Sequence, residues 1–142
     1  MDYVRVVNET RGRVLGGRIG LADSLGLRLR GFLLRREPAA GEGLLLAPSR
    51  GVHMYGMRFP LDVLFIDHGG EVVAVHPGLP PGARTPVYGS ARYALELPNG
   101  TIARSGTCIG DRLSWRPATA AGLRVDLMGS DMTPDLTRTG SR

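Results

Sequence analysis

The chain has 142 residues, of which 42% are hydrophobic and 22% charged, the proportions of one ordinary globular domain. All 18 basic residues are arginine and the formal net charge is +5. The absence of lysine excludes a P-loop, pyridoxal chemistry and a Schiff-base aldolase, because each of them depends on a lysine amine. The single cysteine, Cys108, excludes an intrachain disulfide and any multi-cysteine zinc or iron–sulfur site.

The arginines are scattered from Arg5 to Arg142 without a basic block. This distribution favours a solvated surface over nucleic-acid binding, and an aromatic content of 6% also argues against a base-stacking surface. No apolar run approaches the roughly 18 residues of a membrane span, and the start of the chain lacks a secretory pattern. We therefore expect a cytoplasmic protein without membrane contact.

In the first part of the chain, β-rich residues 2–7 predict a strand. Residues 11–23 continue with apolar residues broken by glycines, which is typical of a turn or hairpin. Residues 23–35 place leucines and a phenylalanine at helical spacing and predict a short helix, weakened by two glycines. Residues 44–48 predict a short buried strand that ends at a proline.

In the second part, residues 61–67 form the clearest strand pattern, with apolar side chains on both faces. A glycine turn and residues 71–77 complete a predicted hairpin. Residues 78–90 are rich in proline and glycine and predict a long loop. Residues 92–98 alternate and predict a strand with one core face, and a last strand is expected around Leu113.

Short strands joined by glycine- and proline-rich turns predict a mainly β fold, a small sandwich or barrel with one short helix, at the margin of α+β. We expect residues 1–117 to form a single globular domain. Residues 118–142 are polar and aperiodic, which predicts a partly disordered C-terminal extension.

The stretch "HMYGMRFPLDVLFID" (53–67) is the densest in chemical groups. His53, Met54 and Met57, together with Cys108, would be soft ligands for Cu(I), but they are too few for a copper motif and methionine more often fills a core. We therefore expect neither a metal nor a cofactor. As a nucleophile Cys108 would need a histidine base, and its apolar neighbours favour a buried, inert thiol.

Two carboxylates lie within predicted strands, Asp62 at the start of one and Glu96 in the middle of another. A buried carboxylate is costly unless it is paired or hydrogen-bonded. One interpretation is a polar pocket of His53, Arg58, Asp62 and Glu96 that binds a small ligand or performs acid–base chemistry, with Arg58 as the partner of Asp62. The other is that the carboxylates fix loops by accepting backbone hydrogen bonds. The second is slightly favoured, and both stay open.

Three separated motifs, "HMYGMRFPLDVLFID", "ALELPNG" and "IGD", resemble in their order the "domain of unknown function 192" family. The resemblance covers roughly residues 5–116 and implies a compact, mainly β domain without an assigned activity. It departs from the family pattern near "GFLLR". The positions that the family marks are His53, Met57, Arg58, Pro60, Asp62, Glu96, Gly100, Gly110 and Asp111. Of these, Met57, Pro60, Gly100, Gly110 and Asp111 are expected to be structural.

Three hypotheses about function follow. The favoured one is a binding module whose polar pocket holds an unidentified small ligand or a segment of a partner protein. The second is a hydrolase-like enzyme that uses Asp62 or Glu96 as acid or base. The third is an arginine-driven nucleic-acid binder, which requires a contiguous basic face.

Overall fold

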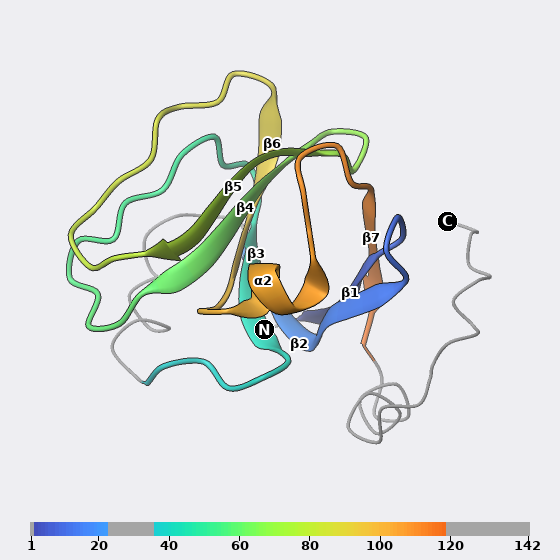
Figure 1. Cartoon of the computed structure of the whole chain (residues 1–142), viewed down its shortest axis with the longest axis horizontal. Helices are drawn as coiled ribbons and strands as arrows, with labels where there is room; N and C mark the ends of the chain where they lie inside the picture. The colour runs from blue at the N-terminus through green and yellow to red at the C-terminus, as the bar shows by residue number, and fades with distance from the viewer. Residues whose placement is uncertain (1, 23–35, 119–142) are drawn as a thin grey trace.

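The computed structural model describes residues 2–22 and 36–118, which form a seven-stranded sheet curled into a half-barrel (Figure 1). The strands are β1 (Tyr3–Asn8), β2 (Arg13–Ala22), β3 (Glu42–Leu46), β4 (Leu61–Asp67), β5 (Val72–Leu79), β6 (Ala91–Pro98) and β7 (Leu113–Pro117). Their order in the sheet is β5-β4-β6-β3-β2-β1-β7. Neighbours are antiparallel except β2 and β3, which are parallel. The mainly β, barrel-like fold is thus confirmed.

The described ranges contain one short helix, α2 (Thr101–Ser105), between the strand predicted at 92–98 and the last strand predicted around Leu113, where no helix was expected. It follows a tight turn and has only one helical turn, too short for a periodic apolar signal. The helix predicted at 23–35 and the proposed extension after 118 lie outside the described residues. No helix in the described ranges is long and apolar enough to cross a membrane.

Apolar side chains cover both faces of the sheet and form two clusters. The helix-side cluster contains Leu64, Leu97 and Ile102 of α2, and the loop-side cluster contains Phe65 and Ala94. Strand β6 lies between β4 and β3 at the centre of the sheet and contributes to both clusters. The expectation that residues 92–98 have only one core face is therefore wrong. Both faces of this central strand are covered, so side chains on each face are buried.

The loop-side cluster is covered by two long loops, residues 47–60 and 80–90, which we call the loop layer. Figure 1 shows them running side by side at the end of the molecule away from β7. Four backbone hydrogen bonds join them: Met54 N–H to the Ala83 carbonyl (2.7 Å), Gly82 N–H to Met54 (2.8 Å), Thr85 N–H to Val52 (3.0 Å) and Tyr88 N–H to Arg50 (2.8 Å). The loops are therefore paired along their length, and the methionines of the first loop pack into the core below.

Close packing around β3 gives a first testable result. A Cβ atom at Gly43 would lie 2.4 Å from the backbone oxygen of Glu96, which cannot move without disturbing β6. We expect Gly43→Ala to lower the free energy of unfolding by about 2–3 kcal/mol through overpacking. Gly89→Ala is the matched control, since nothing lies within 4 Å of the added carbon. Urea denaturation followed by Trp115 fluorescence compares the two; equal midpoints would contradict the packing.

Candidate functional site

Asp62 is fully buried at the start of β4, with its side chain on the helix-side face of the sheet. Its Oδ1 accepts the N–H of Gly78 at 2.8 Å. Its Oδ2 accepts the N–H of Gly100 at 3.1 Å and that of Ile102 at 2.7 Å. Both oxygens are therefore engaged by backbone donors, which satisfies a charge that would otherwise be costly to bury. This carboxylate joins β4 to the end of β5 and to the first turn of α2.

Glu96 is also buried, but on the other face of the sheet. Asp62 lies opposite Leu97 in the β4–β6 register, and directly opposed residues of antiparallel strands share a face. Glu96 precedes Leu97 and therefore points to the opposite side, where Leu44 and Val63 are its neighbours in β3 and β4. The sheet separates the two carboxylates, so the structure does not bring them together in one pocket.

Arg58 and His53 belong to the loop layer, and both are exposed. The prediction that Arg58 pairs with Asp62 is wrong, because the carboxylate of Asp62 is turned inward to backbone amides. The ring of His53 stacks on Tyr55, with centroids 4.7 Å apart, and its Nδ1 accepts the Tyr55 N–H at 3.3 Å. His53 and Arg84 also form an antiparallel bridge, which places their side chains on the same side of the paired loops. Of the four candidate pocket residues, the loop layer thus holds only two.

The residues expected to be structural lie at turns and in the core. Met57 is buried in the loop-side cluster, and Pro60 is half-buried directly before β4. Gly100 has a φ of 99°, and a Cβ there would lie 2.9 Å from the guanidinium of Arg104. Gly110 has a φ of 96°, and its N–H donates to the carbonyl of Val72 at 2.8 Å. Both glycines occupy the left-handed region that side chains disfavour.

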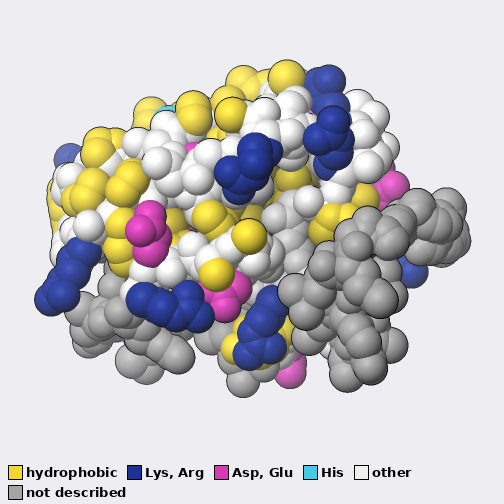
Figure 2. All heavy atoms as spheres, turned by 60° about the horizontal axis from the view of Figure 1, so that its bottom comes forward, with side chains coloured by type: hydrophobic (Ala, Val, Ile, Leu, Met, Phe, Trp, Pro, Cys, Tyr) yellow, Lys and Arg dark blue, Asp and Glu magenta, His cyan; other side chains and the backbone are white. Residues whose placement is uncertain are grey.

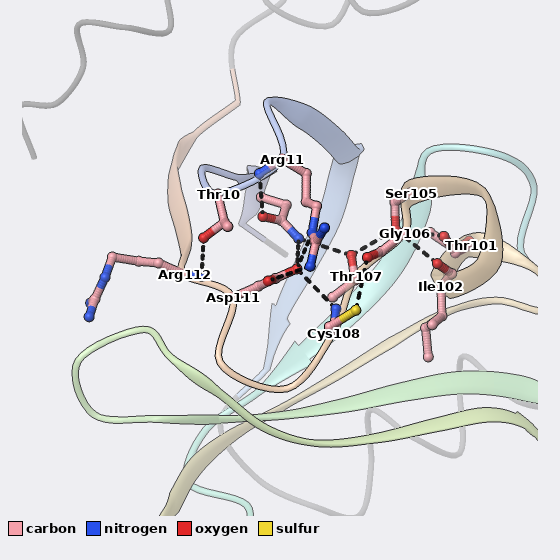
Figure 3. Close-up of polar contacts among 11 residues, drawn as sticks. Thr10, Arg11, Thr101, Ile102, Ser105, Gly106, Thr107, Cys108, Asp111 and Arg112 are labelled. Atoms are coloured by element: carbon pink, nitrogen blue, oxygen red, sulfur yellow. Dashed lines mark hydrogen bonds and ion pairs between the residues drawn. The ribbon is translucent and has the colours of Figure 1, made fainter.

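Asp111, the last of these residues, is the centre of a buried polar network (Figure 3). Its carboxylate accepts Nε and Nη2 of Arg11 at 2.9 and 3.1 Å, Nδ2 of Asn8 at 3.0 Å and the N–H of Cys108 at 2.9 Å. Asn8 also donates to Thr107, at 3.0 Å. Hydrogen bonds from Arg11, above all, hold the pKa of Asp111 well below its ordinary value. The network joins the β1–β2 turn to the segment that precedes β7.

The exposed position of Cys108 corrects the expectation of a buried thiol. The segment turns here so that the backbone N–H reaches Asp111, which leaves the side chain outside with its Sγ 3.4 Å from the Gly106 carbonyl (Figure 3). Within residues 2–22 and 36–118, no three side chains of the histidine, cysteine, aspartate and glutamate types are grouped as metal ligands.

Like the network around Asp111, an aromatic contact beneath the loop layer was not indicated by the sequence. His76 of β5 lies 2.8 Å from the hydroxyl of Tyr88 through Nε2, and both rings contact Phe65. Since Tyr88 belongs to the second loop, this contact fixes the loop layer to the sheet. The sequence around His76, a histidine followed by a proline near the end of a strand, does not indicate that a tyrosine of the second loop contacts it.

His76 makes stability depend on pH. Partial burial lowers the pKa of His76 from its ordinary 6.5, so below that value the unfolded chain binds a proton that the folded chain resists. The contribution of neutral His76 to the free energy of unfolding should therefore be fully present above pH 6.5. It should decrease as the pH falls from 6.5 through the lowered pKa. Urea denaturation at several pH values between neutral and about 5 tests this. His76→Gln should flatten the dependence in this range, whereas His68→Gln, in the exposed β4–β5 turn, should keep it.

The arginines form no continuous patch on the face seen in Figure 2, where acidic and apolar side chains separate them. Two arginines form ion pairs between described residues: Arg11 with Asp111, and Arg36 with Glu42 at 2.9 Å. Arg18 lies over the ring of Tyr3, 4.1 Å from its centroid. Several basic side chains therefore serve the fold itself.

The curled sheet, its buried aspartate and its paired loops define a small, mainly β domain. The chain belongs to the DUF192 family, described as an uncharacterised ACR, whose model matches residues 6–115. The UPF0127 protein of Thermococcus sibiricus is 34% identical over 116 residues, which are 78% of this chain and 73% of the relative. That of Thermococcus kodakarensis is 32% identical over 116 residues, 79% and 73% of the two chains. The resemblance drawn from the three motifs is confirmed.

Two solved structures share the fold. A Sinorhizobium meliloti protein, provisionally described as a transcription regulator, is 30% identical with a TM-score of 0.65, and the match covers 81% of this chain and 96% of that one. A protein of unknown function from Novosphingobium aromaticivorans is 24% identical with a TM-score of 0.67, over 80% and 84% of the two chains. The second of these similarities concerns the fold alone.

Proposed function

We propose that the chain is a non-catalytic binding module that recognises a segment of a partner protein through its loop layer. The observation that carries this proposal is the cluster of Tyr55, His53 and Arg84, exposed side by side on two loops that are fixed to each other and to the sheet. A cytoplasmic location stays a prediction that accompanies it.

The positions of the two buried carboxylates argue against acid–base catalysis and so favour a binding module over a hydrolase. A hydrolase of the kind considered needs an acid and a base within reach of each other and of a substrate. Asp62 is fully buried, with both oxygens engaged by backbone amides, and Glu96 is 2% exposed on the opposite face. Neither group is placed to exchange a proton with a substrate at the same site.

The exposed cluster has the composition of a recognition surface. Tyrosine and arginine are enriched among the residues that dominate binding energy at protein interfaces. Tyr55 keeps 53% of its surface exposed although it is stacked on His53, so one face of the ring is fixed while the rest is available. A side chain fixed in this way loses little conformational entropy when a partner binds.

The test is selection of binders from a library of random displayed peptides against the full chain. We expect an enriched set whose binding is weakened about tenfold or more by Tyr55→Ser, the loss typical of an anchor residue. Ile109→Ser is the matched control, since Ile109 is an exposed apolar residue outside the loop layer. Binders that tolerate Tyr55→Ser but not Ile109→Ser, or no enrichment, would contradict the proposal.

A further inference from the structure

Resting on this proposed function, we infer that the segment recognised by the loop layer is acidic and carries an apolar side chain. Three observations lead to this class of partner: the charge of the two loops, the pairing that arranges their arginines, and the apolar side chains exposed among them.

The loop layer is basic throughout. Residues 47–60 and 80–90 contain Arg50, Arg58 and Arg84 but no aspartate or glutamate, although the whole chain has 13 acidic residues. All three arginines are exposed, and none forms an ion pair with another described residue. Among the described residues no carboxylate neutralises these guanidinium groups, so this surface is complementary to the carboxylates of a partner.

Loop pairing holds two of these arginines, Arg50 and Arg84, on the same pair of joined loops. Arg84 lies beside His53 in the antiparallel bridge, and the carbonyl of Arg50 accepts the N–H of Tyr88 further along the same pair of loops. Arg92, exposed at the start of β6, adjoins them because its carbonyl accepts the N–H of Ser49 at 2.9 Å. The planar guanidinium fork binds carboxylates through two hydrogen bonds, which makes arginine suited to an extended acidic segment.

Exposed apolar side chains favour a protein segment over a nucleic acid. Val87 is 76% exposed and Tyr55 is 53% exposed, on the same two loops as the arginines. A phosphate backbone calls for a continuous basic track. A mixture of cations with an aliphatic and an aromatic contact instead matches a peptide with carboxylates around one apolar residue.

Fluorescence anisotropy tests the inference with a labelled peptide of glutamate and glycine around one central leucine. The control peptide has the same sequence with every glutamate replaced by glutamine. We expect the glutamate peptide to bind the full chain about tenfold more tightly at low salt, with a difference that decreases as salt screens the charges. Combining Arg50→Gln, Arg58→Gln and Arg84→Gln should abolish the difference. Arg116→Gln, which removes an exposed arginine from β7, should leave it unchanged.

The outcomes separate this inference from the proposed function. If displayed peptides bind in a Tyr55-dependent manner but the glutamate and glutamine peptides bind equally, the inference is overturned and the binding module stands. If no peptide depends on Tyr55, the binding module itself fails. If a DNA or RNA oligonucleotide binds through the same three arginines more tightly than the glutamate peptide, the partner is a nucleic acid and the inference is overturned.

Discussion

Replacing Asp62 with alanine should lower the free energy of unfolding by about 4 kcal/mol, among the largest effects expected of any single substitution in this chain. The substitution leaves three backbone N–H groups, of Gly78, Gly100 and Ile102, without the fully buried carboxylate that accepts from them. Since small domains are stable by about 5–15 kcal/mol, the variant should stay mostly folded in water but unfold at a much lower urea concentration than the wild type. Urea denaturation monitored by circular dichroism measures the loss.

Two further variants distinguish a structural carboxylate from a catalytic one. Asp62→Asn keeps one acceptor oxygen but turns an amide group toward backbone donors, and should cost about 2–3 kcal/mol. Asp67→Asn is the control at the other end of β4, where the carboxylate caps an exposed turn by accepting the N–H groups of Gly69 and Glu71. Its effect should stay below about 1 kcal/mol. An Asp62→Asn protein as stable as the wild type would contradict the structural role.

The second large effect is expected at Asp111. Asp111→Ala removes the shared acceptor of Arg11, Asn8 and Cys108 and should cost about 3 kcal/mol at neutral pH. Because the pKa of Asp111 is lowered in the folded chain, the unfolded chain binds a proton first as the pH falls below about 4. The stabilisation is therefore complete at neutral pH and is lost on acidification. Unfolding by urea at a series of acid pH values measures this slope.

Arg11→Gln provides the matched comparison for Asp111. It removes the ion pair but leaves Asn8 and the Cys108 N–H as donors to the carboxylate, so its effect should be smaller than that of Asp111→Ala. The slope between pH 4 and lower values should become shallower in this variant and still more so in Asp111→Ala. A wild-type slope retained in Asp111→Ala would show that another group is responsible.

Sequence reasoning predicted most strands because each carries a local pattern. The β4–β5 hairpin follows from two apolar runs around a glycine turn, and side chains alternate between the two faces of each strand. That alternation sets the direction of a side chain within its own strand, but it leaves open which strands are neighbours. Only the β4–β6 register shows that the two faces are opposite, and so that no single pocket holds both carboxylates.

Contacts between distant segments could not be predicted in the same way. Asn8 and Asp111 are joined by a hydrogen bond across 103 positions, because β1 pairs with β7, and neither residue has a local pattern that indicates the other. The loop layer is a similar case. Its pairing is made by backbone groups of His53 and Arg84 in glycine- and proline-rich loops, where side-chain periodicity carries no information.

In the proposed function Asp62 stabilises the fold and the loop layer binds the partner. The most direct test is a titration of the isotope-labelled chain with the tightest displayed peptide, followed by NMR chemical shifts of the backbone amides. We predict that the shifts change at residues 47–60 and 80–90, while the amides of Gly78, Gly100 and Ile102 that hold Asp62 stay unchanged. Changes centred on those three amides, with an unaffected loop layer, would contradict it.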